Sequence, residues 1–180
     1  KIDSISQVAS KYAVASEYDK MIGKMGRKGT NAFTSNEMTV YTNDIPSNEL
    51  NKWLTLESER FSELVLRLFH TELETVYEEF NMSQDNDYRK AYYTLFEHMF
   101  PTHQYGQQTT IGKGEHLKNP SMNSIRKYWN SYYVPNNMAI CLAGDFNPDS
   151  VIVMIKEKFG PFESKEVPTF EVAQEAPITS

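Results

Sequence analysis

Residues 69–81, FHTELETVYEEFN, place four carboxylates and one imidazole within ten residues. These side chains are Glu72, Glu74, Glu78, Glu79 and His70. Carboxylate and imidazole groups are ligands for zinc, and two carboxylates held close together can also act as a general acid and base. Charged residues at this density are equally typical of the solvated face of a helix. The segment therefore has three interpretations: a metal site, an acid/base pair or a solvent-facing surface.

Helix geometry divides the four glutamates into two pairs. Each residue advances about 100° around a helix axis, so Glu72 and Glu79 lie within about 20° of each other, two turns apart. Both border the apolar stripe of the expected helix, whereas Glu74 and Glu78 point toward solvent. The stripe consists of Leu66, Phe69, Leu73, Val76 and Phe80.

The histidines do not complete a metal site by their spacing. A zinc site needs three protein ligands, and histidine is usually among them. His98, His103 and His116 are scattered over an expected helix end and a loop, and none has a histidine partner four residues away. The residues alone therefore favour a solvated helix face over a metal site.

Composition excludes several other functions. The net charge of −6 argues against a nucleic-acid groove or a polybasic membrane surface. No apolar run approaches the 18 or so residues that a membrane span requires. Cys141 is the one cysteine, so an internal disulfide and a cysteine-based zinc cage are both impossible. Its apolar surroundings, MAICLAG, predict a small buried residue.

Hydrophobic spacing predicts the elements that must position these side chains. A helix is expected over 4–25, where Ile5, Val8, Tyr12, Ala15, Ile22 and Met25 recur at spacings of three, four and seven. Two strands joined by a turn at Ser35–Asn36 come next. The remaining expectations are a helix from Pro46, the acidic helix to about Ser83, helices over 87–99, 121–134 and 147–160, a loop over 100–120 and a buried strand over 137–146. Asn147 suits the N-cap of the last helix and Pro148 its first position. This order predicts an α+β fold.

The order of several motifs resembles the pitrilysin/insulinase family of zinc peptidases, the inverzincins. The similar segments are GTNAFTSNEMTVYTNDIPSNELNKWLTLESERF, ELETVYEEFNMSQDN, LFEHMFPTHQYGQQTTIGKGEHLKNPSMNSIRKYWNSYYVPNNMAICLAGDF and NPDSVIVMIKEKFG, and they cover about residues 5–162. The resemblance implies helices packed on one face of a mainly antiparallel sheet, as in metalloenzyme domains of the mitochondrial processing peptidase type. Residues 1–162 would form a partial peptidase domain without its N-terminal ligand helix. Residues 163–180 would be a linker toward the next domain.

The same resemblance implies a zinc site that is only partly present. In the family, two histidines of H-x-x-E-H on an upstream helix and a downstream glutamate bind the metal. Alignment of the acidic helix gives Glu79 the ligand position and Glu72 a supporting position beside it. No H-x-x-E-H occurs in the 180 residues, so we expect the motif upstream of Lys1, before a charged helical insertion. The fragment alone is then expected to be inactive and to bind no zinc tightly.

Substrate and partners also follow from the resemblance. Asn31, Ala32 and Phe33 would form an exposed strand edge to which an extended peptide adds as a further strand. A second homologous peptidase domain, in the same or another chain, would complete the chamber, and the family suggests the bacterial periplasm or cell envelope as the compartment. Two alternatives are a non-catalytic homologue that binds or positions peptides and an unrelated α+β binding domain. An intact upstream H-x-x-E-H would favour the enzyme.

Overall fold

The computed structural model describes residues 5, 8, 11–12, 16–66, 68–118 and 120–177. The chain forms two compact units. Unit 1 is built from residues 1–32, 41–67 and 121–168, and unit 2 from residues 33–40, 68–120 and 169–180.

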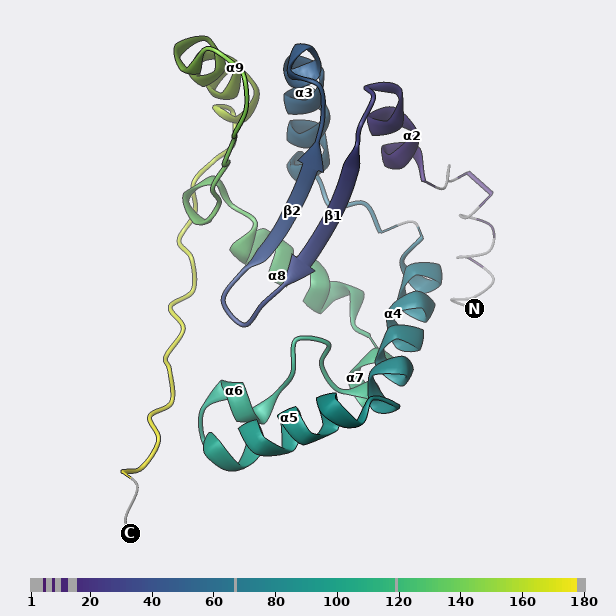
Figure 1. Cartoon of the computed structure of the whole chain (residues 1–180), viewed down its shortest axis with the longest axis vertical. Coiled ribbons are helices and arrows are strands. Elements are labelled where there is room, and N and C mark those ends of the chain that lie inside the picture. Colours follow the sequence, from purple (N-terminus) through teal and green to yellow (C-terminus); the bar gives the residue numbers. More distant parts are fainter. Residues whose placement is uncertain are drawn as a thin grey trace. The chain divides into compact units, whose positions relative to one another are not determined.

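Unit 1 combines helices with most of a β-hairpin (Figure 1). Its elements are α2 (Glu17–Lys24), η1 (Ser47–Glu49), α3 (Leu50–Ser62), α8 (Met122–Tyr132), η2 (Pro135–Asn137) and α9 (Pro148–Phe159), together with the larger part of strands β1 (Gly29–Thr34) and β2 (Thr39–Asp44). Its buried apolar side chains are Ile22, Leu54, Val134 and Val151. Leu54 on α3 and Val151 on α9 belong to two helices that pack against each other.

Local sequence explains where α9 begins. The Asn147 side chain accepts a hydrogen bond from the backbone N–H of Ser150, and Pro148 occupies the first turn. An N-cap side chain satisfies a backbone donor that the helix itself cannot, and proline at the first position loses no helical hydrogen bond. The predicted start of this helix is confirmed.

The hairpin is an antiparallel pair whose register can be followed from side-chain contacts. Thr30 Oγ1 lies 2.9 Å from the Asn43 amide, and the Thr34 and Thr39 hydroxyls are 3.4 Å apart. Ser35 N–H donates to the Met38 carbonyl at 2.8 Å and closes the turn at the predicted position. These contacts place residues whose numbers sum to 73 opposite each other. Asn31 therefore pairs with β2, while the backbone N–H and C=O of Ala32 point to the outer edge of β1.

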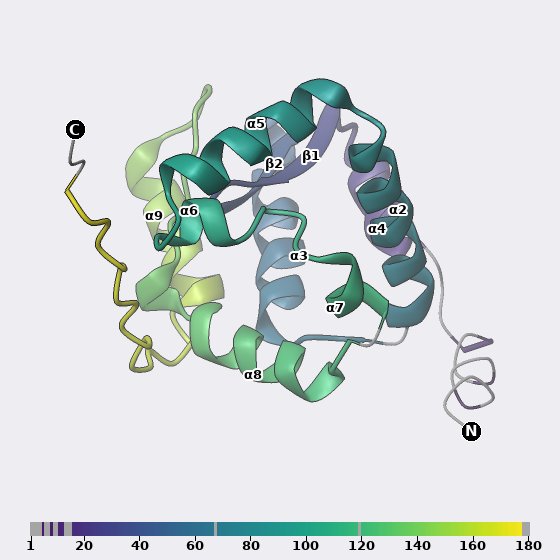
Figure 2. The ribbon, with the colours of Figure 1, turned by 90° about the horizontal axis from the view of Figure 1, so that it is seen from below.

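Unit 2 is helical apart from the hairpin tip. Its helices are α4 (Phe69–Gln84), α5 (Asp87–Met99), α6 (Gln104–Gln107) and α7 (Gly114–Lys118). Figure 2 shows α6 folded back beside α5. This close return needs Gly106, because a Cβ there would stand 2.2 Å from the Phe100 carbonyl oxygen. Together with the hairpin, these helices confirm the predicted α+β class.

The helix expected over 4–25 is not continuous: residues 5, 8 and 17–24 are helical, but residues 11, 12 and 16 are not. Ser16 has φ of 58°, in the left-handed region, and α2 begins only after it. A right-handed helix cannot continue through such a residue. Ile5, Val8 and Tyr12 are exposed instead of forming a buried stripe, and Ala15 lies outside the described residues.

The buried strand expected over 137–146 is also wrong. Residues 138–146 form no strand, and Cys141, expected to be buried, is exposed. The segment has a strand-like composition, but a strand requires backbone partners beside it. In the part of the chain that the structure describes, the only sheet is the two-stranded hairpin, which leaves this segment unpaired.

Candidate functional site

The two glutamates singled out by their spacing lie on α4 as expected. Glu72 is in the first turn, where its backbone N–H donates to the Leu68 carbonyl at 3.0 Å. A carboxylate is favourable there because the helix N-terminus carries partial positive charge. Glu79 follows two turns later on the same flank, and both side chains are exposed.

Helix α7 packs on the side of α4 that carries Tyr77 and Phe80. Phe80 of α4 lies so close to Gly114 of α7 that an added Cβ would stand 2.8 Å from its ring. The Lys118 ammonium lies 5.9 Å from the centre of the Tyr77 ring. Val76, in the part of the apolar stripe nearest to Glu72 and Glu79, is 37% exposed. Within unit 2, α7 therefore packs on the Tyr77 side and leaves the Glu72–Glu79 flank open.

These two carboxylates do not make a metal site by themselves. Among the residues that the structure describes, no group of three or more His, Cys, Asp or Glu side chains could hold a metal ion. In the same set, neither Glu72 nor Glu79 makes a hydrogen bond or ion pair through its carboxylate. Zinc needs three protein ligands. Two exposed carboxylates on one helix flank supply at most two such ligands.

Two of the histidines have local structural roles. His98 Nδ1 lies 2.8 Å from the Thr94 carbonyl oxygen within α5. His103 caps α6, because its Nδ1 accepts a hydrogen bond from the Tyr105 backbone N–H at 3.1 Å. Both contacts join each histidine to a residue no more than four positions away.

The candidate peptide edge is exposed along its whole length. All six residues of β1, including Asn31, Ala32 and Phe33, are exposed. The Ala32 N–H, which points to the outer edge, donates to the Asn31 side-chain oxygen at 2.9 Å. An added strand would take the place of that local contact. Of the three residues, Ala32 has the backbone groups directed for pairing, and Asn31 and Phe33 flank it.

Unit 1 contains a charged network that was not predicted from the sequence. Glu57 on α3 is 4% exposed, accepts a hydrogen bond from the Tyr18 hydroxyl at 2.6 Å and lies 2.5 Å from Arg60 Nη2. The Arg60 guanidinium stands 4.6 Å over the Tyr18 ring and 4.7 Å over the Tyr41 ring. Burial, followed by the hydrogen bond to Glu57, raises the pKa of Tyr18 to about 12. The signal in the sequence was Glu57 falling on the same helix face as Trp53 and Phe61.

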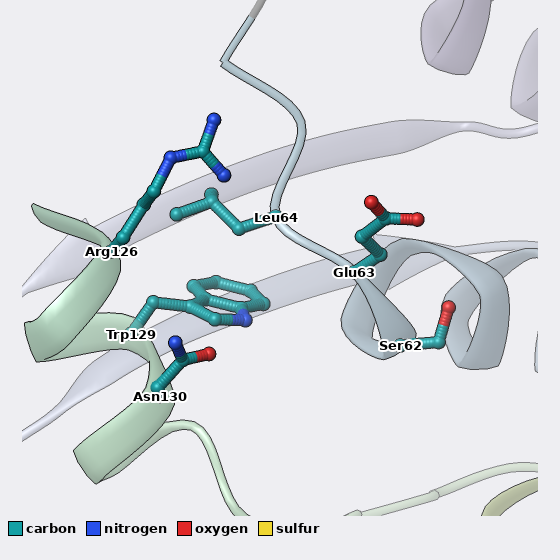
Figure 3. Close-up of a pocket in the computed structure, with 6 residues that line it drawn as sticks. All are labelled: Ser62, Glu63, Leu64, Arg126, Trp129 and Asn130. Carbon is teal, nitrogen blue, oxygen red and sulfur yellow. The ribbon is translucent and has the colours of Figure 1, made fainter. Parts of the chain in front are cut away.

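A shallow pocket of unit 1 lies where α3 ends and α8 passes (Figure 3). Its lining residues are Ser62, Glu63, Leu64, Arg126, Trp129 and Asn130. The Trp129 ring stacks on Tyr133 with centroids 3.9 Å apart, so one wall of the pocket is part of the aromatic packing of unit 1. Figure 3 shows Arg126 and Glu63 at opposite ends of the pocket. The lining contains no histidine, and Glu63 is its one carboxylate.

Among the described residues, no helix has both the length and the apolar character that crossing a membrane requires.

Comparisons with known proteins agree with the order of motifs along the chain. The sequence model for insulinase, peptidase family M16, matches residues 5–111, and the model for the peptidase M16 inactive domain matches residues 121–179. The chain is 28% identical over 174 residues to the zinc protease PqqE of Helicobacter pylori, covering 93% of this chain and 39% of that protein. It is 29% identical over 154 residues to the uncharacterized zinc protease YmxG of Bacillus subtilis, covering 84% of this chain and 36% of that protein.

A solved structure shows the same likeness in three dimensions. The crystal structure of a protease from Helicobacter pylori superposes with a TM-score of 0.76 at 26% identity, covering 85% of this chain and 38% of that one. The chain thus spans about two fifths of the length of the relatives it matches. Because one family model covers more than half of the sequence and its relatives are zinc proteases, this chain belongs to the insulinase family of peptidases, M16.

Proposed function

We propose that the chain is part of a zinc-dependent endopeptidase that hydrolyses extended peptides in an enclosed chamber, with Glu79 as one zinc ligand. The observation that carries the proposal is the open flank of α4. Glu72 and Glu79 lie two turns apart on it, exposed and without internal partners among the described residues, while α7 packs on the other side. Family membership gives that spacing a chemical meaning which the helix alone does not have.

The remaining ligands would come from residues beyond these 180. Inverzincins bind zinc through two histidines of H-x-x-E-H, and this sequence contains no such motif. Glu72 would support the site without coordinating, by hydrogen bonding that orients its neighbours. When bound, zinc would polarise the scissile carbonyl and activate a water molecule. The 180 residues alone would bind no zinc tightly and would be inactive.

The chain's own contribution to substrate binding would be the outer edge of β1. A peptide in extended conformation would pair with the outward N–H and C=O of Ala32, with Asn31 and Phe33 on either side. Main-chain pairing is independent of side-chain identity, so this edge would fix the direction of the peptide more than its sequence. A second homologous domain would close the chamber, in keeping with relatives more than twice this length.

Zinc content of the full-length protein tests the ligand assignment. Glu79→Gln should lower zinc affinity by more than the 10–100-fold typical of supporting residues, and Glu72→Gln should fall within that range. Glu78→Gln is the matched control, because Glu78 is exposed on the same helix but points away from this flank. Metal analysis after dialysis against a chelator gives the readout. A Glu79→Gln protein that keeps its zinc would overturn the assignment.

The second candidate function is a non-catalytic family member that binds peptides without cleaving them. Residues 121–179 match a model described as an inactive domain, which is the observation in its favour. Sequencing the coding region upstream of Lys1 separates the two. An intact H-x-x-E-H supports the enzyme, and replacement of its histidines or glutamate supports the peptide-binding homologue.

A further inference from the structure

Two acidic side chains from distant segments converge on the connection between α5 and α6. We call residues 100–105 the α5–α6 corner. The Glu37 carboxylate reaches the corner from the hairpin turn, 68 residues before Tyr105. The Glu175 carboxylate reaches it from the C-terminal segment, 72 residues after His103. All of these residues belong to unit 2.

Tyr105 is held in one orientation by its surroundings. Its ring packs edge-on against His103, with centroids 4.4 Å apart, and edge-on against Phe100 at 5.8 Å. The His103 ring also accepts the Tyr105 backbone N–H. A tyrosine fixed by two aromatic neighbours and a backbone hydrogen bond can hold its hydroxyl in one place at small entropic cost.

The hydroxyl of Tyr105 donates to Glu37 Oε1 at 2.6 Å. A hydrogen bond from a phenol to a carboxylate is among the stronger kinds in proteins. The bond to Glu37 raises the pKa of Tyr105, so the phenol remains a donor throughout the physiological range. Glu37 is thereby tied to a fixed point of the α5–α6 corner.

The hairpin tip, residues 33–40, makes few other hydrogen bonds to the described residues of unit 2. Its turn is closed by internal hydrogen bonds among Ser35, Glu37 and Met38, and the Phe33 and Met38 side chains are more than half exposed. Among the described residues, Tyr105 makes the one hydrogen bond that reaches the turn from outside the hairpin. The position of the tip relative to α5 therefore depends on this contact.

The α5–α6 corner is itself fastened from its other side. Glu175 accepts hydrogen bonds from the backbone N–H groups of Thr102 at 2.8 Å and His103 at 2.5 Å. These bonds lower the pKa of Glu175 despite partial desolvation, and they leave the carboxylate ionised near neutral pH. The corner is thus ordered enough to serve as a fixed point for the hairpin.

We propose that Tyr105 is a positioning residue for peptide binding: its hydrogen bond to Glu37 holds the tip of the hairpin so that β1 presents its outer edge to the substrate. The proposal rests on the proposed function, in which β1 accepts an extended peptide. It assigns a role to the Tyr of the P-x-H-x-Y-G segment and to Glu37, two residues outside the zinc site. Tyr105 contacts neither the metal nor the scissile bond in this scheme.

Hydrogen–deuterium exchange of the 180-residue chain tests the contact directly. Tyr105→Phe deletes only the hydroxyl, and the backbone amides of residues 33–40 should then exchange about tenfold faster. Tyr88→Phe is the matched control, because Tyr88 lies on α5, is 80% exposed and has no hydrogen-bond partner among the described residues. Equal exchange in Tyr105→Phe and in the unmodified chain would overturn the contact.

Peptide kinetics of the full-length zinc-loaded protein test the positioning role. Tyr105→Phe and Glu37→Ala should each raise KM about five- to tenfold, with kcat within about twofold and zinc content unchanged. Because each variant removes the same hydrogen bond, the double variant should show no further increase in KM. Glu37→Gln keeps an oxygen acceptor and should restore part of the affinity. Additive effects, or a loss confined to kcat, would contradict the proposal.

The exchange and kinetic experiments distinguish a failure of the positioning role from a failure of the proposed function. If the full-length protein binds the peptide without cleaving it, the dissociation constant replaces KM, and only the endopeptidase assignment fails. If the protein cleaves peptides and Tyr105→Phe leaves KM unchanged, the positioning role fails while the endopeptidase assignment stands. Faster exchange of the tip with unchanged KM would also reject the positioning role, because it would show a contact without consequence for the substrate.

Discussion

Tyr18, Glu57 and Arg60 form a compact charged group in unit 1. The nearly buried Glu57 carboxylate is paired with Arg60 and accepts the Tyr18 hydroxyl, and the Arg60 guanidinium is covered by aromatic rings. A buried carboxylate is tolerated because charge pairing and hydrogen bonding replace its lost hydration. Removing Arg60 would leave the Glu57 carboxylate buried without its charge partner. The group therefore fastens α2 to α3 within unit 1.

Alkaline pH should weaken unit 1 through Tyr18. Its pKa is raised to about 12, whereas tyrosine in an unfolded chain ionises near 10. Below pH 10 or so both states keep the proton, and the contribution of Tyr18 to stability is fully present. As pH rises from about 10 to about 12 the unfolded state loses its proton first, so stability falls. Because Tyr18 is only half buried, solvent screening limits the loss to about 1 kcal/mol.

Chemical denaturation across this pH range measures the effect. The unmodified chain should lose more stability between neutral pH and pH ~11 than a Tyr18→Phe variant, which has no proton to release there. Tyr88→Phe should behave like the unmodified chain, since Tyr88 is exposed. Parallel losses in the unmodified and Tyr18→Phe chains would show that Tyr18 is not the group responsible.

At the scale of elements, sequence pattern succeeded where one segment determines its own structure. The α4 spacing of Glu72 and Glu79, the Asn147 cap and the hairpin turn at Ser35 all depend on residues close in sequence, and all three are found. The helix expected over 4–25 is interrupted at Ser16. Hydrophobic periodicity cannot predict that one residue adopts a left-handed conformation. The strand expected over 137–146 failed because pairing is non-local: composition favours a strand, but only a neighbouring strand can make one.

The candidate site was predictable to the same extent. Glu72 and Glu79 could be paired by helix geometry, and their role came from the resemblance. The contacts of Tyr105 with Glu37 and of Glu175 with His103 join segments about 70 residues apart, and no local pattern reports such contacts. The boundary between the peptidase domain at 1–162 and the linker at 163–180 stays a prediction, as do the peptide-binding roles of Asn31, Ala32 and Phe33.

The outward orientation of Ala32 gives the β1 edge a specific test. Ala32→Pro removes the N–H that an added peptide strand would use, yet the hairpin ladder does not need that donor. In the full-length protein we expect KM for an extended peptide to rise about tenfold, with the free energy of unfolding nearly unchanged. Ala32→Val keeps the N–H and should have little effect on KM. If Ala32→Pro leaves KM unchanged, the peptide does not pair with β1 through Ala32.

At the scale of the whole molecule, we propose that the chain is one part of a longer peptidase. Its relatives are more than twice as long, and the described residues hold no group of three metal ligands. We therefore expect the isolated 180 residues to lose zinc completely to a moderate chelator that leaves the full-length protein loaded. Competition with a chromophoric chelator measures the zinc affinity of the isolated chain and of the full-length protein. Tight stoichiometric zinc in the isolated chain would show that these residues contain the full ligand set.

The unpaired segment 138–143 also bears on how these 180 residues behave in solution. Met-Ala-Ile-Cys-Leu-Ala is uncharged, contains no proline and leaves Ile140 and Cys141 accessible. Such a stretch offers free backbone donors and acceptors to any other copy of itself, which is the chemical basis of cross-β association. The yield of soluble protein on refolding should therefore fall with chain concentration. Ile140→Lys would place a charge in this stretch and should lower such association.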